Sequence, residues 1–267
     1  MKHKLPSLRT SELKNYLGGT MQEVRMLKAG EQALVVEFGK EIDPFVNAHV
    51  HRLARILAAE MPAHILEMVP TYRSLMVYFD PLVITRETLQ DNIAKYLPGL
   101  EAVASSSDKT RIVTIPVSYG GDFGPDLDFV ANHNAMTEAE VVAIHTSIPY
   151  LVYMLGFTPG FPYLGGMSER IATPRLDLPR VKIPAGSVGI AGTQTGIYPI
   201  ESPGGWRLIG RTPLKLFSPA DESPFLFAAG DYLQFAAIGL DEYGALKEQV
   251  ANGSYAPVVR NVARAGA

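Results

Sequence analysis

The segment from residue 156 to residue 213 concentrates the residue types that bind small anions. It holds 11 of the 24 glycines and 8 of the 20 prolines of the chain. Its acidic side chains are Glu169, Asp177 and Glu201. Its cations are twice as many: Arg170, Arg175, Arg180, Lys182, Arg207 and Arg211. The segment therefore carries a local charge of +3, six cations minus three anions, in a chain whose net charge is -3.

This composition has two interpretations. A basic, glycine-rich surface exposes backbone N–H groups beside guanidinium forks, which suits a carboxylate or phosphate ligand. Alternatively, the glycines serve β-turns and the arginines simply face water.

The stretch "WRLIGRTPLKLF" favours the ligand site. In a strand, alternate residues share a face, so three cations are predicted to lie together: Arg207, Arg211 and Lys215. The opposite face then carries Leu208, Leu214 and Leu216. Trp206 and Glu201 nearby are consistent with a lined pocket, while a solvated barrel exterior remains the alternative.

The histidines offer one candidate acid or base. "TEAEVVAIH" is predicted to be a helix that begins with a capping box, Thr137 and Glu140, and His145 lies at its end. His145 is therefore the candidate catalytic residue, with a packed or capping histidine as the alternative. His49 and His51, two residues apart on a predicted helix, point in different directions and cannot ligate one metal.

Cofactor signatures are missing from the sequence. No HExxH, EF-hand or cysteine–histidine pattern is present, and the chain has no cysteine, so we predict no metal site. The loop "AGSVGIAG" lacks the lysine of a P-loop and the spacing of a dinucleotide fingerprint.

Bulk composition limits the classes of partner. The 267 residues are 47% hydrophobic and 19% charged, which is typical of a globular protein. The small negative charge gives no indication of nucleic acid or an anionic membrane. No secretory signal is visible at the N-terminus, and no apolar run reaches the ~20 residues that span a bilayer. We expect a soluble, cytoplasmic protein.

The elements that must position these residues differ between the two halves. Up to about residue 100, two strand pairs alternate with two helices, which predicts a small α+β sandwich. Asp43-Pro44 and Thr85 are the predicted helix starts. After the small, polar stretch "EAVASSSDKT", short strands and turns dominate, as in a β-barrel.

Several motifs together resemble one family. They are "YGGDFGPDL", "GFTPGFPYLGG", "IPAGSVGIAGTQTGIYPIESPGGWRLIGRTP", "DPFVNAHVHRLARIL" and "VPTYRSLMVYFD". The chain resembles the family of B-type subunits of 5-oxoprolinase, earlier labelled allophanate hydrolase subunit 1, which includes a sporulation histidine-kinase inhibitor. The resemblance covers about residues 22 to 240, and it departs from the family pattern at Ile148-Pro149.

The resemblance implies a fold and a domain division. It implies an N-terminal α/β domain at 22–104 and a cyclophilin-like β-barrel at 105–245. Residues 1–21 are then an N-terminal extension, and residues 246–267 are a C-terminal tail.

The resemblance also implies a function and partners. The resemblance implies that this chain acts with a second subunit of 5-oxoprolinase, the C-type subunit, and that the two together activate 5-oxoproline (pyroglutamate) with ATP. A third subunit, the A-type subunit, then completes the hydrolysis to glutamate. Related domains occur in urea carboxylase. The expected substrate- or phosphate-binding residues are Arg207, Arg211, Gln194, Tyr198 and Glu201. Trp206 and Phe161 are the expected partner contacts.

Two further functions share the same motifs. One is a regulatory inhibitor that binds a sensor histidine kinase, and the other is a subunit of a urea- or allophanate-processing complex. The sequence does not separate these from the 5-oxoprolinase function.

Overall fold

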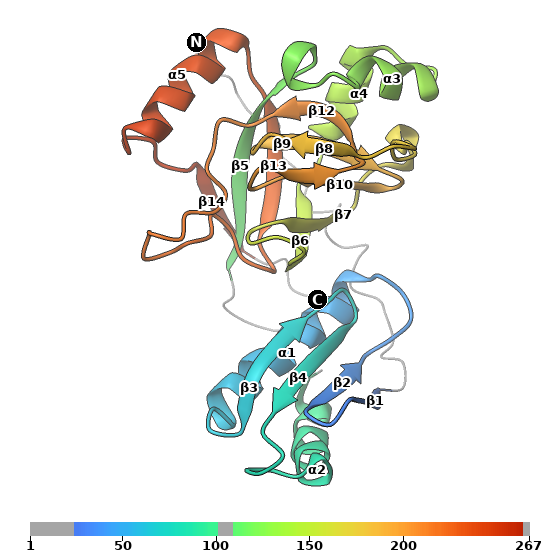
Figure 1. Ribbon diagram of the computed structural model, residues 1–267, viewed down its shortest axis with the longest axis vertical. Coiled ribbons are helices and arrows are strands. Elements are labelled where there is room, and N and C mark those ends of the chain that lie inside the picture. The colour runs from blue at the N-terminus through green and yellow to red at the C-terminus, as the bar shows by residue number, and fades with distance from the viewer. Residues whose placement is uncertain (1–23, 101–108, 264–267) are drawn as a thin grey trace. The chain divides into compact units, whose positions relative to one another are not determined.

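The computed structural model describes residues 24–100 and 109–263, and these divide into two compact units (Figure 1). The first unit contains the described residues up to Lys109, and the second runs from Thr110 to Val262. The expected extension at 1–21 lies outside the described residues, as does the expected boundary between residues 104 and 105. Within the described ranges, no helix is long and apolar enough to cross a membrane.

The first unit is an antiparallel sheet packed on helices. The strand order is β1 (Arg25–Ala29), β2 (Ala33–Glu37), β4 (Ser74–Phe79) and β3 (Ile65–Pro70). The helices are α1 (Pro44–Glu60), which lies behind the sheet in Figure 1, and α2 (Arg86–Tyr96) with the short turn η2 (Leu97–Leu100). Alternate strand residues face the helices and form the core, including Leu34, Val36, Leu75, Val77 and Phe79.

Both helices of this unit begin where the sequence predicts. The Asp43 carboxylate accepts hydrogen bonds from the N–H groups of Phe45 at 2.7 Å and Val46 at 3.2 Å, with Pro44 in the first turn. The Thr85 hydroxyl accepts from the Thr88 N–H at 3.2 Å. These side chains satisfy N–H groups that have no partner within the helix.

The second unit is a nearly closed, barrel-like sheet with three helices among its described residues. The strand order is β10 (Gln194–Ile197), β9 (Ser187–Ala191), β12 (Arg207–Arg211), β5 (Lys109–Tyr119), β13 (Tyr232–Ala237), β6 (Tyr150–Leu155) and β7 (Pro162–Gly165). An eighth strand, β14 (Val259–Ala263), pairs with β5. Because β10 and β7, at the two ends of this order, lie against each other, the sheet forms a barrel. The predicted α+β class with a β-barrel in the second half is confirmed.

Helices and a ribbon surround the barrel. The helices are α3 (Leu127–His133), α4 (Glu138–His145) and α5 (Leu240–Ala251), with short turns η3 (Gly121–Phe123) and η4 (Glu169–Ile171). In Figure 1, α3 lies beside α4, and α3 also contacts β12. β8 (Arg180–Ile183) and β11 (Ser202–Gly204) form a separate two-stranded ribbon. The expected boundary at residue 245 falls inside α5, and residues 246–262 belong to the same compact unit as the barrel.

A hydrogen-bonded histidine crosses the barrel core. His145 is fully buried, and the Tyr119 hydroxyl lies 2.8 Å from its Nδ1 atom. His145 Nε2 lies 2.8 Å from the Thr195 hydroxyl, which itself donates to the Gly189 carbonyl. Since that hydroxyl's proton is used, Nε2 must be the protonated nitrogen and Nδ1 accepts from Tyr119. One neutral histidine therefore links β5, α4, β10 and β9.

This arrangement corrects the catalytic interpretation of His145. Both ring nitrogens already have partners, and the ring packs 4.4 Å from Phe235, centroid to centroid. Burial lowers the pKa of His145 from 6.5 to about 3. A base at neutral pH must be accessible to its substrate, and this ring is not exposed. Its role is structural.

The lowered pKa makes the barrel acid-sensitive. The unfolded chain protonates His145 near pH 6.5, whereas the folded chain does so only near pH 3. Stability is therefore full above pH 6.5 and falls as the pH drops toward 3, by about 2 kcal/mol between pH 8 and pH 5. Glutamine cannot titrate, so we expect the free energy of unfolding of His145→Gln to fall by about 2 kcal/mol less than that of the wild type between pH 8 and pH 5.

The measurement is urea unfolding at the two pH values, followed by the fluorescence of Trp206, the single tryptophan. Trp206 lies in the barrel unit and reports on it. Equal pH slopes for the two proteins would contradict the buried, neutral histidine.

Candidate anion-binding site and aromatic cluster

A β-bulge in β12 decides where the two candidate arginines point. Arg207 lies opposite Ile190 of β9, and Arg211 lies opposite Ser187, with a register shift between Leu208 and Gly210. Directly opposed residues point to the same face, and Ser187 and Ile190 are three residues apart on their strand. Arg207 and Arg211 therefore point to opposite faces of the sheet.

The predicted single cationic face is consequently wrong. The bulge inserts Ile209 as an extra residue and reverses the alternation after it. Leu208 packs in a small aromatic cluster, while Ile209, Leu214 and Leu216 pack in the main barrel core. A register shift depends on the partner strand, and the residues of β12 themselves carry no sign of it.

Arg207 is stacked on an aromatic ring at the end of β12. Its guanidinium carbon lies 3.6 Å from the centre of the Phe129 ring on α3. Its Nε–H donates to the Pro174 carbonyl at 3.3 Å. The ring and the carbonyl fix the orientation of the guanidinium. Its other N–H groups have no hydrogen-bond partner within residues 24–100 and 109–263 and could donate to a ligand.

Arg211 has fewer partners than Arg207. Its guanidinium carbon lies 5.1 Å from the centre of the Phe123 ring, and within the described residues its buried Nε–H has no hydrogen-bond partner. No ion pair joins Arg211 to a described carboxylate. Burial raises the pKa of Tyr243, and the nearby Arg211 cation acts in the opposite direction, so this phenol lies beside the guanidinium.

A second unpaired polar atom lies next to Arg211. Ser187, directly opposite on β9, is fully buried, and its hydroxyl has no partner among the described residues. Buried polar groups are nearly always hydrogen-bonded, so two unpaired groups on neighbouring strands make this a candidate position for a polar ligand. A carboxylate or phosphate oxygen would accept hydrogen bonds from both.

Arg180, by contrast, has a structural role. Its Nη2 atom lies 2.8 Å from Asp126 Oδ1 in an ion pair, and its Nη1 atom donates to the Trp206 carbonyl. The other Asp126 oxygen accepts the Leu208 N–H at 2.6 Å. Asp126 was not among the predicted site residues, although it lies within the "YGGDFGPDL" motif.

Four aromatic rings form a cluster beside the β8–β11 ribbon. The ring of Phe161 lies 5.4 Å from Tyr163, 5.7 Å from Tyr198 and 5.6 Å from Trp206, always edge to face. The indole packs against Gly196, where a Cβ atom would lie only 3.0 Å from it. A side chain at this position would require the indole and the Phe161 ring, 3.2 Å from the same Cβ position, to shift by a few tenths of an ångström.

The cluster changes the expected partner contacts. Phe161 is only 3% exposed, so it supports its neighbours from inside and cannot itself meet a partner, which corrects that part of the prediction. Trp206 is partly exposed and remains a candidate contact.

The other predicted ligand residues lie in β10 and in the segment that follows it. Tyr198 is 2% exposed within the cluster, and burial raises the pKa of its phenol. Glu201 is exposed and pairs with Lys182 at 2.9 Å. Gln194 begins β10 opposite Ala191, beside the turn between β9 and β10. The structure therefore places Tyr198 against Trp206, the predicted partner contact. It does not assemble the five predicted ligand residues into one pocket.

No metal centre accompanies these residues. In the ranges 24–100 and 109–263, no group of three or more histidines, cysteines or carboxylates could hold a metal ion.

Known proteins have sequences and folds that are similar to those of this chain. Residues 24–227 match the family model described as carboxyltransferase domain, subdomain C and D. The chain is 45% identical to the B-type subunit of 5-oxoprolinase from Bacillus subtilis (strain 168) over 234 residues, which cover 82% of this chain and 95% of the relative.

Two crystal structures show similar folds. That of TTHA0988 has a TM-score of 0.67 at 35% identity, covering 78% of this chain and 40% of that chain. This chain thus spans less than half of TTHA0988. The urea carboxylase of Kluyveromyces lactis has a TM-score of 0.71 at 23% identity, covering 89% of this chain and 24% of that chain, a likeness of fold alone. Together, the family model and the Bacillus subtilis relative show that the chain belongs to the 5-oxoprolinase B-type family of carboxyltransferase-type domains.

Proposed function

We propose that this chain is the B-type subunit of an ATP-dependent 5-oxoprolinase complex in the cytoplasm, which converts 5-oxoproline to glutamate. The family membership and the identity of 45% to a protein of that name support the proposal. The C-type subunit is the partner in substrate activation, and the hydrolysis is completed by the A-type subunit. The observation that carries the site assignment is the guanidinium of Arg211, which lacks an anionic partner among the described residues and lies beside the unpaired Ser187 hydroxyl.

The chemistry of the substrate fits this site. 5-Oxoproline carries a carboxylate and a lactam, and an amide carbonyl is a weak electrophile because its nitrogen donates electron density to it. Activation with ATP must place a phosphate near this carbonyl. Either the carboxylate or the phosphate would accept charge-assisted hydrogen bonds from Arg211, with Ser187 as a further donor. No residue of this chain is assigned to the adenine.

Arg207 has a separate role in this proposal. Because it points to the other face of β12 and is stacked on Phe129, it cannot share one ligand oxygen with Arg211. We assign it to a second anionic group of the assembled complex, and Tyr198, Gln194 and Glu201 remain candidates near the aromatic cluster.

The first expected outcome concerns Arg211. Arg211→Met keeps much of the stem packing and removes the charged hydrogen bonds, so kcat/KM for 5-oxoproline should fall by about ten- to a hundred-fold. The measurement is 5-oxoproline-dependent ATP hydrolysis by the reconstituted complex, with thermal melts to confirm folding.

Lys215→Met is the matched control, because Lys215 is exposed and follows β12 on the same chain segment. It should stay within two-fold of the wild type. If Arg211→Met also stays within two-fold, Arg211 is only a surface cation.

The second expected outcome concerns the isolated chain. Purified alone, it should not turn over 5-oxoproline, because its candidate acid or base, His145, is buried with both ring nitrogens hydrogen-bonded. The same ATPase assay, run with and without the other subunits, measures this. Full turnover by the single chain would disprove a site shared between subunits.

The third expected outcome concerns Trp206. Trp206→Ala removes a partly exposed aromatic, the residue type that dominates interface energetics, and should weaken co-purification with the C-type subunit. Since the indole also packs on Gly196, thermal melting must show that the variant is folded. A folded variant that binds as tightly as the wild type would place the interface elsewhere.

A further inference from the structure

The loop between β6 and β7 holds a phenylalanine in a strained conformation. Phe157 has a φ angle of 63°, in the left-handed region that side chains other than glycine rarely adopt. The Thr158 N–H donates to the Gly156 carbonyl at 2.7 Å, which makes Phe157 the central residue of a γ-turn, in its rare positive-φ form. Such backbone strain persists only where surrounding structure enforces it, and it concentrates at functional sites.

Hydrogen bonds and packing hold this loop in place. The Phe161 N–H donates to the Thr158 carbonyl at 3.0 Å, and the Gly156 N–H donates to the Phe161 carbonyl at 3.1 Å. Gly160 has a φ angle of 81°, and a Cβ atom there would lie 3.1 Å from Cβ of Phe217. Hydrogen bonds between Gly156, Thr158 and Phe161 and the packing of Gly160 on Phe217 therefore fix the conformation of the loop.

The strained residue presents its ring to solvent. The Phe157 side chain is 75% exposed, and its one described ring contact is an edge-to-face pair with Phe161 at 6.2 Å. Exposing a phenylalanine forgoes the favourable transfer of its ring out of water. In the isolated chain, then, both the backbone and the side chain of Phe157 are in unfavourable states.

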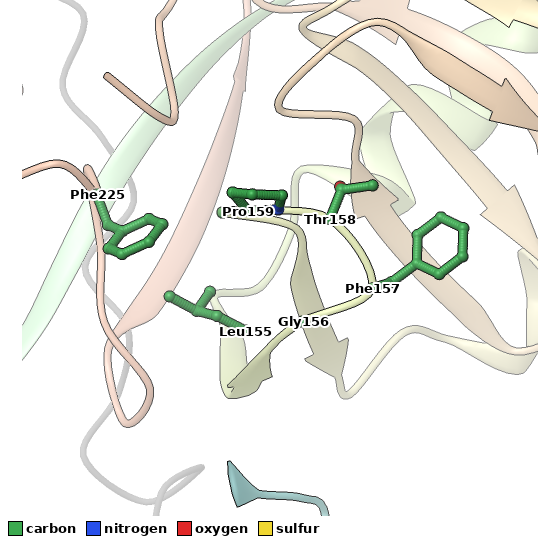
Figure 2. Close-up of a pocket in the computed structure, with 7 residues that line it drawn as sticks. Leu155, Gly156, Phe157, Thr158, Pro159 and Phe225 are labelled. Atoms are coloured by element: carbon green, nitrogen blue, oxygen red, sulfur yellow. The ribbon is translucent and has the colours of Figure 1, made fainter. Parts of the chain in front are cut away.

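A shallow apolar pocket lies on the same loop. It has a volume of about 310 Å³ and is lined by Leu155, residues 156–160 and Phe225. Figure 2 shows the Phe157 ring directed away from Leu155 and Phe225, so the loop presents a protruding ring next to a hollow. Phe225 is itself 40% exposed. An exposed aromatic ring beside a shallow pocket is better matched by the surface of a partner protein than by a small ligand.

An acidic turn borders the pocket. Phe217 and Phe225 pair across a β-bridge, and the Ser218 N–H donates to the Pro224 carbonyl at 2.8 Å, which closes the turn between them. This turn carries two exposed carboxylates, Asp221 and Glu222, and no cation. A partner that covers the pocket would therefore gain from lysine or arginine side chains opposite the turn.

We propose that Phe157, the pocket and the acidic turn form a docking surface for the C-type subunit of the complex, which contributes an apolar segment flanked by basic residues. This inference rests on the proposed function for the identity of the partner. A second copy of the chain fits less well, because a two-fold interface would place the same acidic turns near each other. The match to this chain covers 40% of TTHA0988. The other 60% of that polypeptide (100% minus 40%) is additional protein that is joined to the matching unit.

The test uses two variants at one position. Phe157→Ala removes the ring, and Phe157→Gly removes both the ring and the strain, since glycine adopts positive φ readily. Each is co-expressed with the other subunits of the complex, and affinity is then measured by titration with the purified C-type subunit. We expect both variants to bind at least about thirty-fold more weakly, as for a buried aromatic anchor. The Gly variant alone should melt about 2–4 °C above the wild type.

Leu240→Ala is the matched control, since Leu240 is 70% exposed at the start of α5 and lies outside this surface. It should bind like the wild type. A double variant, Asp221→Asn with Glu222→Gln, should bind more weakly than the wild type and show less weakening in high salt.

The outcomes separate this inference from the proposed function. If the wild type forms an active complex with the C-type subunit while both Phe157 variants bind within two-fold of it, the docking surface is wrong and the proposed function stands. If the Gly variant does not melt above the wild type, the strain argument fails. If the wild type shows no binding to the C-type subunit, the inference and the proposed partner fail together.

Discussion

The buried carboxylate of Asp126 sets the geometry of the barrel face on which the candidate residues lie. One oxygen accepts the Leu208 N–H and the other pairs with Arg180, while the Asp126 N–H donates to the Leu208 carbonyl. Asp126 is thus the hydrogen-bond partner of both the N–H and the carbonyl of Leu208 at the bulge of β12. Asp126 is only 7% exposed, and a buried charge of this kind is tolerated only when it is paired and hydrogen-bonded, as it is here.

The bulge beside Asp126 separates two environments that a regular strand would have merged. Leu208 joins the aromatic cluster, whereas Ile209, one residue later, enters the barrel core. The arginines diverge for the same reason, Arg207 toward Phe129 and Arg211 toward Phe123. A bulge re-aims side chains without changing the strands on either side, which is why such features accompany binding sites.

Local signals in the sequence were sufficient for the elements but not for the site. The helix starts at Asp43, Thr85 and Thr137 depend on residues within three positions, and all three caps are present. The barrel also followed from its short strands and turns. The burial of His145 depends on Tyr119 and Thr195, which are 26 and 50 residues away, and no local pattern contains that information.

The aromatic residues show the same limit at shorter range. Phe157 and Phe161 lie in one motif, and their types alone do not tell which is buried and which is exposed. The γ-turn at Phe157 and the packing of Gly160 decide it. The motif contains both rings, but backbone conformation determines which of them faces solvent.

Two energetically unfavourable features of the isolated chain, at Arg211 and Phe157, have a common explanation. Arg211 keeps a partly buried cation without a described counter-charge, and Phe157 keeps a strained backbone beneath an exposed ring. A protein selected only for its own stability would lose both, because a neutral side chain at the first position and glycine at the second would remove the cost. Sequences tolerate such costs where function requires them. An anion at Arg211 and a protein surface at Phe157 would each offset one of these costs, and a subunit of a larger enzyme meets both.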